Sequence, residues 1–285
     1  MDDAIRKAES LIEAMSYIRR FRDHLIAIKL GGSAMEDPAA LTATLQDVVF
    51  MATVGLRPVL VHGGGKPIDR AMASAGLVAR KVLGRRYTDA ATLEIVVRVL
   101  LEVNTSIVAQ IHQLGGRAVG LHSPPLPVLF GERLTLDGED LGHVGSVTRV
   151  DTALIESFCA GGVVPVIPSL ALDETGGWLN VNADTAASAV AVHLHTEKLV
   201  FLSDTPGILT DRRDPASLVA TLDANRCREL ICTGVIDSGM IPKVEACLDS
   251  LRGGVRQTHM IDGRLRHSLL LEIYTHKGVG TEIIL

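Results

Sequence analysis

The chain has 285 residues, of which 47% are hydrophobic, 21% charged and 3% aromatic, and 28 basic against 33 acidic residues give a formal net charge of −5. This composition excludes a disordered chain, and it argues against a nucleic-acid binder, which would carry a basic excess. The length suffices for one large core or for two lobes. Seven of the 28 basic residues are lysines, so the position of each lysine is informative.

The cysteines and the N-terminus indicate a cellular compartment. Cys159, Cys227, Cys232 and Cys247 form no CxxC spacing, which favours free thiols over a disulfide framework or a structural zinc site. The N-terminal segment lacks the apolar stretch of a secretory signal, and no run reaches the roughly 18 apolar residues of a membrane span. We therefore expect a cytoplasmic protein that has no membrane partner.

Residues 1–24 predict an amphipathic helix. Ile5, Ala8, Ile12 and Met15 recur at spacings of three and four with charged residues between them. Two interpretations remain open: the helix packs on its own domain, or it reaches a neighbouring subunit.

Short apolar runs follow, and helical patterns lie between them. Such runs predict parallel strands that are covered on both faces, and hence a doubly wound α/β fold. The runs are residues 25–30, 58–61, 118–121, 163–168 and 199–202.

Helices are predicted from caps and periodicity. Asp37 followed by Pro38 is typical of an N-cap and a first helical residue. Residues 88–114, 182–195 and 241–251 show further helical patterns.

Residues 122–150 break this rhythm. Pro124, Pro125 and Pro127 precede short alternating pieces, which predict β-hairpins added to the main sheet. If the chain forms two lobes, we expect the join near residues 178–184.

Three glycine-containing turns follow predicted strands, at residues 31–33, 63–65 and 204–207. Ligands of parallel sheets bind beyond the carboxyl ends of the strands, where glycine allows close approach and free N–H groups favour an anion. One such turn is more often a plain tight turn, but three on one sheet favour a ligand site.

Familiar motifs do not match. Lys66 is followed by proline and lacks the upstream glycine of a Walker A loop, and Ile68 stands where GxGxxG needs its third glycine. His62 opens an HGGG sequence, as in some esterases, but the chain contains no GxSxG. His193 and His195 would lie on different faces of a helix, so no protein metal site is predicted.

Two lysines stand at predicted helix starts. Lys29 ends the first apolar run directly before two glycines, and Lys243 lies in a glycine-led segment. Two cations so placed could surround a polyphosphate from both sides, and Lys66 lies beside the second glycine turn. The other four lysines are interpreted as surface charge: Lys7, Lys81, Lys198 and Lys277.

Seven segments in chain order resemble the amino acid kinase family, and within it the members that phosphorylate N-acetyl-L-glutamate. They are LIAIKLGGSAM, PVLVHGGGKPID, GRRYTD, WLNVNADTAA, LVFLSDTPGIL, GMIPKVEACL and IDGRLRHSLLLEI. The resemblance implies a three-layer αβα sandwich with an open, mainly parallel sheet. It also implies an N-terminal oligomerisation helix (1–24), a lobe for acetylglutamate binding and dimerisation (25–179) and an ATP-binding lobe (180–285).

The resemblance also implies roles for individual residues. Lys29 and Lys243 would stabilise the transferring phosphoryl group, and Asp184 would hold both lysines. Substrate-binding positions would be Gly31, Gly32, Gly64, Gly65, Arg86 and Asn180. Nucleotide-binding positions would be Asp204, Gly207, Ile208, Leu209, Gly239, Met240 and Ile241.

The implied reaction transfers a phosphoryl group from ATP to the γ-carboxylate, in arginine biosynthesis. A carboxylate with a pKa of about 4.3 is already ionised at neutral pH and needs no general base. It needs relief from charge repulsion, which lysines, glycine N–H groups and Mg²⁺ bound through the nucleotide phosphates would supply.

The N-terminal helix resembles that of arginine-inhibited hexamers built from three dimers, so we expect such a hexamer, or a dimer, and feedback inhibition by L-arginine. Some family members also bind a PII-type signalling protein. This chain departs from the family pattern at two places. His276-Lys277 replaces an acidic pair that is frequent near the C-terminus, and Lys66-Pro67 stands after the second glycine turn, where an uncharged residue is more often expected. Candidate arginine contacts are Tyr17, His267, Glu272 and Gly280.

Two alternatives remain. A carrier-linked aminoadipate kinase would share nearly every motif. A catalytically silent arginine-sensing scaffold is the other, and intact Lys29, Asp184 and Lys243 argue against it.

Overall fold

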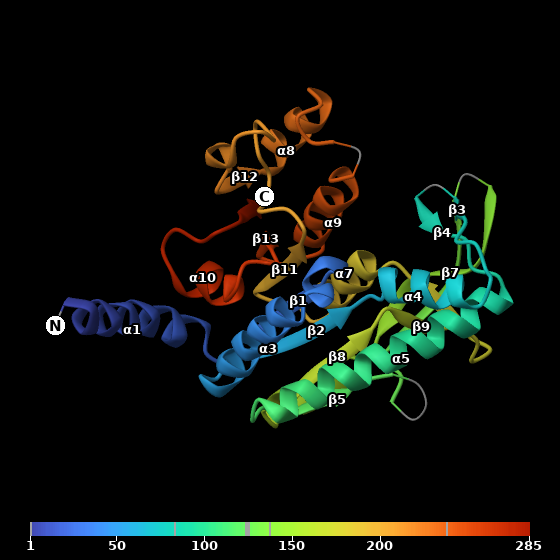
Figure 1. The fold of residues 1–285 in the computed structure, drawn as a ribbon, viewed down its shortest axis with the longest axis horizontal. Coiled ribbons are helices and arrows are strands. Elements are labelled where there is room, and N and C mark those ends of the chain that lie inside the picture. The colour runs from blue at the N-terminus through green and yellow to red at the C-terminus, as the bar shows by residue number, and fades with distance from the viewer. Residues whose placement is uncertain (1, 83, 123–125, 137, 238) are drawn as a thin grey trace.

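The computed structural model describes residues 2–82, 84–122, 126–136, 138–237 and 239–285. Within these residues the main sheet has eight strands in the order β12-β14-β13-β11-β1-β2-β8-β5 (Figure 1). Neighbouring strands pair in parallel except at β13 and β14. The predicted open, mainly parallel sheet is therefore confirmed.

The elements have the following bounds. The strands of the main sheet are β1 (Leu25–Leu30), β2 (Arg57–His62), β5 (Ala118–Gly120), β8 (Val164–Pro168), β11 (Lys198–Ser203), β12 (Thr221–Asp223), β13 (Gln257–Asp262) and β14 (Thr281–Ile284). The other strands are β3 (Lys81–Val82), β4 (Arg85–Arg86), β6 (Leu129–Leu136), β7 (Glu139–Val150), β9 (Leu170–Leu172) and β10 (Trp178–Val181). The helices are α1 (Asp2–Phe21), α2 (Gly32–Glu36), α3 (Pro38–Thr53), α4 (Gly65–Ser74), α5 (Ala90–Gln113), α6 (Thr152–Ala160), α7 (Ala183–His193), η1 (Pro215–Ser217), α8 (Ala224–Cys232), α9 (Ile241–Arg252) and α10 (Ser268–Tyr274).

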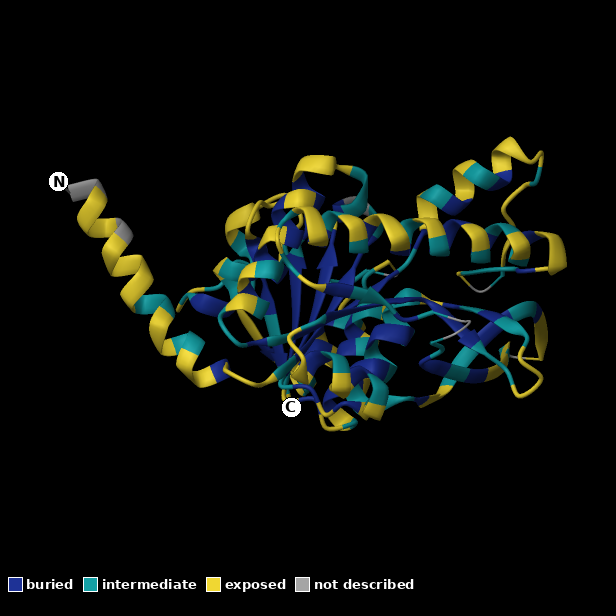
Figure 2. Ribbon diagram, turned by 90° about the horizontal axis from the view of Figure 1, so that it is seen from below, coloured by how far each residue is buried: buried dark blue, intermediate teal, exposed yellow. Residues whose placement is uncertain are grey.

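Helices cover both faces of the sheet. In β1, Ala27 packs into the core under α6, α7 and α9, whereas Ile26 and Ile28 pack into the core under α3, α5 and α10. Successive strand residues point to opposite faces, so a continuous apolar run is what a sheet buried on both sides requires. Figure 2 shows the buried strands between partly exposed helices. The three-layer sandwich is confirmed.

The predicted helix starts are confirmed by their caps. The Asp37 carboxylate accepts a hydrogen bond from the amide of Ala39 at 2.8 Å, and proline opens α3. The Asn182 side chain accepts from the amides of Asp184 and Thr185, which starts α7 within the segment expected to join two lobes.

The predicted hairpin forms, but its attachment to the main sheet is wrong. β6 and β7 pair with each other and close a small barrel with β9 and β10. β8 leads directly through Ser169 into β9. The hairpin therefore pairs with β9 and β10 and not with a strand of the main sheet. Pro124 and Pro125 lie outside the described residues.

α1 extends away from the body of the molecule (Figures 1 and 2). Its C-terminal end packs against α10, where Phe21 is buried. Leu11 and Ile12, farther out, are 70% and 65% exposed. Among the described residues, no helix combines the length and apolar character that crossing a membrane requires.

The sheet order reverses at β1. From β1 the chain proceeds to β2 on one side, and its later strands β11 and β13 lie on the other. The loops after β1 and β11 therefore run in opposite directions from this point. A place where the strand order reverses is called a switch point, and open α/β sheets bind ligands there.

Candidate active site

Two lysines converge on one aspartate at this switch point. Lys29 Nζ, at the end of β1, lies 2.8 Å from Asp184 Oδ1, and Lys243 Nζ, in the first turn of α9, lies 2.9 Å from Asp184 Oδ2. Asp184 itself lies in the first turn of α7. Three segments far apart in the sequence thus meet at one carboxylate, and the cluster carries a net charge of +1.

Burial sets the electrostatics of this cluster. Lys29 is only 7% exposed. Burial lowers the pKa of Lys29, which Asp184 opposes by stabilising the ammonium. Burial would raise the pKa of Asp184, but the two ammonium groups outweigh it and hold that pKa at about 2. Asp184 is therefore a carboxylate at neutral pH and holds both cations.

A cavity of about 500 Å³ opens above Lys29 and Asp184. Gly32, Gly64 and Gly65 line it from the two glycine turns, and Arg86 and Asn180 line it from the side of the small barrel. The structure thus brings most of the predicted substrate-binding residues around one space.

Gly31 does not line this cavity, but its position admits no side chain. A Cβ there would lie 2.3 Å from the carbonyl oxygen of Leu202 and 3.3 Å from Lys29 Nζ. Glycine therefore allows the first turn to pass between β11 and the lysine.

The Arg86 guanidinium is held at the cavity wall. Nη2 donates to Asp69 Oδ1 at 2.6 Å, and Nη1 lies 3.2 Å from the sulfur of Met72. Asn180 Nδ2 donates to Thr88 Oγ1 at 3.0 Å. Both predicted anchors are thus fixed by neighbours, and a planar guanidinium suits a carboxylate ligand.

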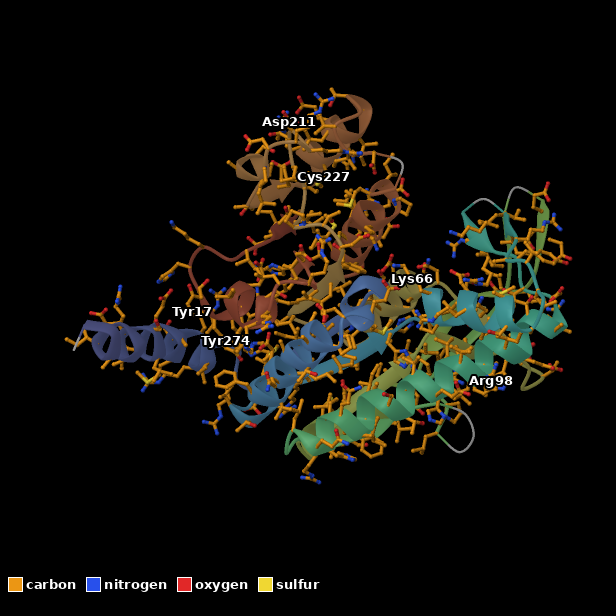
Figure 3. The ribbon with its side chains drawn as sticks, viewed as in Figure 1. Tyr17, Lys66, Arg98, Asp211, Cys227 and Tyr274 are labelled. Carbon is orange, nitrogen blue, oxygen red and sulfur yellow. The ribbon has the colours of Figure 1, made fainter. Side chains whose placement is uncertain are left out.

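Lys66 forms an ion pair with Glu36 across the two glycine turns. Lys66 comes from α4 and Glu36 from α2, and Lys66 lines the cavity. Figure 3 labels Lys66 at the end of α4 that faces the middle of the molecule. Lys66, which departs from the family pattern, therefore places a cation at the cavity mouth.

A second cavity, of about 300 Å³, lies in the C-terminal part. Gly207, Ile208, Leu209 and Met240, four of the predicted nucleotide-binding residues, line it. Gly239 and Ile241 flank Met240 in the chain without lining this cavity.

Two of these turn residues have defined positions. Gly207 has φ +143°, a backbone conformation that favours glycine, and a Cβ there would lie 2.4 Å from Thr281 Oγ1. Asp204 follows β11 and is exposed, and its charge raises the pKa of Lys29 slightly against burial.

The candidate arginine contacts take part in three separate hydrogen-bonded pairs. Tyr17 Oη lies 2.7 Å from His276 Nδ1, which joins α1 to the segment after α10. Glu272 accepts the amide of Gly280 at 3.0 Å, so these two residues are in contact. His267 instead bonds Asp47 of α3 at 2.6 Å.

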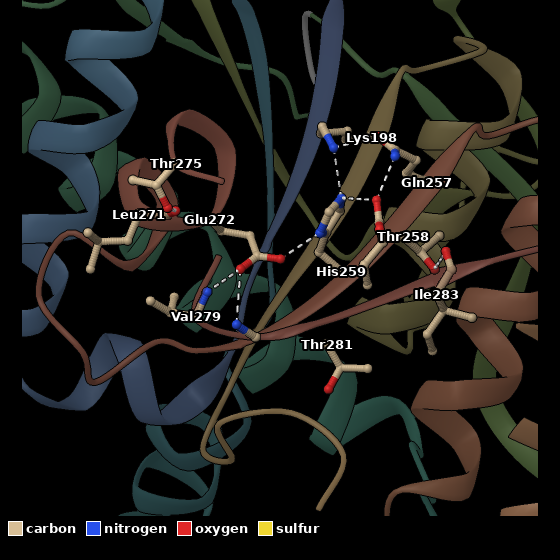
Figure 4. Close-up of polar contacts among 12 residues, drawn as sticks. Lys198, Gln257, Thr258, His259, Leu271, Glu272, Thr275, Val279, Thr281 and Ile283 are labelled. Atoms are coloured by element: carbon tan, nitrogen blue, oxygen red, sulfur yellow. Dashed lines mark hydrogen bonds and ion pairs between the residues drawn. The ribbon is translucent and has the colours of Figure 1, made fainter. Parts of the chain in front are cut away.

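Lys198 was interpreted as surface charge, and that interpretation is wrong. Lys198 is 5% exposed, and its Nζ lies 3.0 Å from His259 Nε2 and donates to Gln257 Oε1. His259 Nδ1 lies 2.7 Å from Glu272 Oε1 (Figure 4). The apolar strand that follows Lys198 was the available signal, because a residue opening a strand buried on both faces is itself enclosed.

Sequence reasoning also missed the residues that orient the site. Asp69, which binds Arg86, and Glu36, which binds Lys66, carry no motif of their own. Asp69 lies three residues from Lys66 and one turn into α4, so the helical periodicity after the glycine turn could have placed it on the cavity side.

The chain is similar to known proteins over nearly its whole length. Residues 24–262 match the model of the amino acid kinase family. The acetylglutamate kinase of Moorella thermoacetica is 45% identical, and the alignment covers 98% of both chains. That of Synechocystis sp. is 44% identical over 99% of this chain and 95% of the relative.

A solved structure has the same fold. The N-acetylglutamate synthase of Neisseria gonorrhoeae, complexed with coenzyme A and N-acetyl-glutamate, superposes with a TM-score of 0.88 at 26% identity. This chain covers 63% of that synthase, which covers 98% of this chain. Together with the sheet order and the lysine cluster at its switch point, these matches show that the chain belongs to the amino acid kinase family.

Proposed function

We propose that this chain transfers the γ-phosphoryl group of ATP to the γ-carboxylate of N-acetyl-L-glutamate, giving the 5-phosphate in arginine biosynthesis. The observation that carries the proposal is the Lys29–Asp184–Lys243 cluster, of which Lys29 and Asp184 line the first cavity. The relatives at about 45% identity are acetylglutamate kinases and match nearly from end to end.

The cluster suits transfer between two anions. Asp184 stays ionised and neutralises one of two positive charges, so one positive charge remains for the phosphoryl oxygens. The substrate carboxylate is ionised at neutral pH and attacks without proton removal. Lys29 and Lys243 then offset the charge that spreads over the phosphoryl oxygens in the transition state, which is the main task in phosphoryl transfer.

Substrate recognition follows from the cavity walls. We assign Arg86 to the α-carboxylate, because its fork is turned to the cavity and pre-oriented by Asp69. Asn180 would hydrogen-bond the polar part of the acetylamino group. Gly31, Gly32, Gly64 and Gly65 would supply backbone N–H groups and close approach.

We propose that ATP binds in the C-terminal lobe, residues 180–285, and the acceptor in residues 25–179. Asp204, Gly207, Ile208, Leu209, Gly239, Met240 and Ile241 would hold the nucleotide. In the described part of the chain, no group of three or more His, Cys, Asp or Glu side chains could hold a metal ion. Mg²⁺ would accordingly be carried by the nucleotide phosphates and would neutralise part of their charge.

The test is a trapping assay. The protein is incubated with MgATP and N-acetyl-L-glutamate, glutamate, aspartate or N-acetyl-aminoadipate, and hydroxylamine captures any acyl phosphate. We expect hydroxamate with N-acetyl-L-glutamate at a rate well above the others. A preference for the aminoadipate would identify the longer acid as the substrate, and no hydroxamate with any acid would indicate a silent scaffold.

We further propose inhibition by L-arginine at the base of α1. Supporting features are the contact of Tyr17 with His276, which joins α1 to the segment after α10, and the contact of Glu272 in α10 with the amide of Gly280. Glu272 is a buried carboxylate of the kind that pairs with a guanidinium. His267 would contribute from the start of α10.

The exposed apolar side chains of α1 support a hexamer of three dimers. Ile5, Leu11, Ile12 and Met15 are 39% to 70% exposed in the described chain and would pack between subunits. Light scattering, together with activity at millimolar arginine, tests both ideas. A dimer that is insensitive to arginine would contradict them. The four cysteines are free, which suits the cytoplasm we propose.

A further inference from the structure

A buried histidine lies directly beneath the second glycine turn. His62 ends β2 and precedes Gly63, and both His62 and Asn104 of α5 are fully buried. Asn104 Nδ2 lies 2.9 Å from the carbonyl oxygen of Val166 and 3.0 Å from His62 Nε2. On the other side of the ring, His62 Nδ1 lies 3.0 Å from the Gly63 carbonyl oxygen. A chain of hydrogen bonds thus runs from β8 to the glycine turn.

This chain determines the tautomer of the ring. The Val166 carbonyl can only accept, so the amide nitrogen of Asn104 must face it. The same nitrogen then donates its second hydrogen to His62 Nε2, which must be unprotonated. Burial lowers the pKa of His62 to about 4, and the nearby His122 adds to that effect, so the ring is neutral at physiological pH. The proton therefore lies on Nδ1, which donates to the Gly63 carbonyl.

The orientation of that carbonyl fixes the next amide. Across a trans peptide, the carbonyl of Gly63 and the N–H of Gly64 point in opposite directions. Since the carbonyl points to the buried ring, the Gly64 N–H points away from it, toward the cavity that Gly63, Gly64 and Gly65 line. Among the described hydrogen bonds, the Gly64 amide has no protein acceptor, so it is available to a ligand oxygen.

Without the His62 ring, the glycine turn has no other side chain that could hold the Gly63–Gly64 peptide in this orientation. A Cβ at Gly64 would lie 2.9 Å from Leu100 Cδ2, and one at Gly63 would lie 3.0 Å from the Cβ of Ala183. The backbone is thus packed closely on both sides but bears no side chain that could hold its peptide planes. The His62 ring supplies that restraint.

We propose that His62, held in its Nδ1–H tautomer by Asn104, is a positioning residue that aims the Gly64 N–H at the transferring phosphoryl group. The role rests on the proposed phosphoryl transfer, although the tautomer does not. Donors aimed in advance at developing charge need no reorganisation during the reaction, and losing one such donor lowers kcat by about 10²- to 10³-fold.

Two substitutions of His62 distinguish a role in positioning the Gly64 N–H from a purely structural role in stability. His62→Asn keeps an N–H donor where Nδ1 stands, and His62→Gln keeps a polar group where Nε2 stands but gives the Gly63 carbonyl no donor. We expect kcat within about fivefold of wild type for Asn and a loss of about 10- to 100-fold for Gln, with KM for ATP nearly unchanged in both. The melting temperature should fall by similar amounts in the two variants.

His112→Leu is the matched control. His112 lies on the same helix as Asn104 and bonds the Ala118 backbone, away from the glycine turn. It should lower the melting temperature and leave kcat unchanged. Equal kcat for the Asn and Gln variants, or kcat that follows the melting temperature across all three, would overturn the positioning role.

The tautomer is measured on the wild-type protein. A long-range ¹H–¹⁵N spectrum of histidine-labelled protein, with His62→Asn to identify the signal, should show Nδ1 protonated and Nε2 bare. A protonated Nε2 would overturn the proposal without any activity data. Wild-type protein that transfers no phosphoryl group would instead contradict the proposed function, while the spectrum would still decide the tautomer.

Discussion

Two buried charge clusters lie on adjacent strands and differ in what they face. Lys29 ends β1 beside a cavity, and its cluster has two ammonium groups on one carboxylate. Lys198 opens β11 at the other end of the strands, where the Phe21 ring covers it at 5.2 Å. The first cluster retains a positive charge and is open to a ligand.

The second cluster is closed and has no excess positive charge. Around Lys198 and His259 stand two carboxylates, those of Glu272 and Glu282, and Gln257 bonds to both Lys198 and Glu282. Figure 4 shows Lys198, Gln257, His259 and Glu272 of this cluster. A buried lysine is therefore not by itself a sign of catalysis. The excess positive charge and the adjacent glycine turns distinguish the catalytic candidate.

The largest effect should come from Asp184→Asn. The substitution removes the group that fixes both lysines, so kcat should fall at least about 10³-fold, whereas KM for acetylglutamate should change little. Steady-state kinetics measures both constants. Activity within tenfold of wild type would remove the role assigned to the cluster.

Lys198→Met is the matched substitution in the second cluster. It should leave kcat within about twofold and lower the melting temperature by several degrees, because Glu282 loses its buried counter-charge. Thermal unfolding and kinetics on one preparation test both halves. A large loss of kcat with an unchanged melting temperature would show that the second cluster also serves catalysis and would contradict its structural role.

Arg86→Lys should give the next largest effect. A lysine cannot present a planar fork to a carboxylate, so KM for acetylglutamate should rise about 10- to 100-fold with a smaller change in kcat. Arg98→Lys, on the exposed surface of α5, is the control. An unchanged KM would place the α-carboxylate elsewhere.

The second cluster should make stability depend on pH. Burial lowers the pKa of His259; for Glu272 burial acts upward, but the bond to His259 and the amides of Val279 and Gly280 lower its pKa overall. Both pKa values then lie below those of the unfolded chain, which binds more protons, so stability falls as pH falls below about 6.5.

His259→Gln tests this dependence. Urea unfolding at pH 7 and pH 5 should show a smaller loss of stability for the variant than for wild type. Asp47 acts in the opposite direction in both proteins, since burial raises its pKa to about 6 and its protonation favours the folded state. Equal losses in the two proteins would show that the cluster does not titrate with folding.

The smallest effect is expected at the base of α1. Tyr17→Phe removes the hydroxyl that bonds His276, which costs about 1 kcal/mol and should raise the arginine concentration for half-inhibition about fivefold. Ser10→Ala, farther out on α1, should not change it. An unchanged inhibition curve for Tyr17→Phe would place arginine away from this contact.

The sequence predicted what local patterns determine. The apolar run before Lys29, the Asp37 cap and the Asn182 helix start all appear where expected, because each depends on residues within a few positions. The small barrel and the burial of Lys198 were missed, because both depend on which strands become neighbours. Asp69, Glu36 and His62 act through partners that are 17, 30 and 42 residues away, so no local pattern reports them.

The central claim is that the open cluster transfers a phosphoryl group to an acyl acceptor. Phosphorus NMR of one reaction mixture of protein, MgATP and N-acetyl-L-glutamate measures this directly. We predict one acyl phosphate for each ADP at early times, with neither product formed in the absence of the acid. ADP that appears without acyl phosphate, or no ADP at all, would contradict the account.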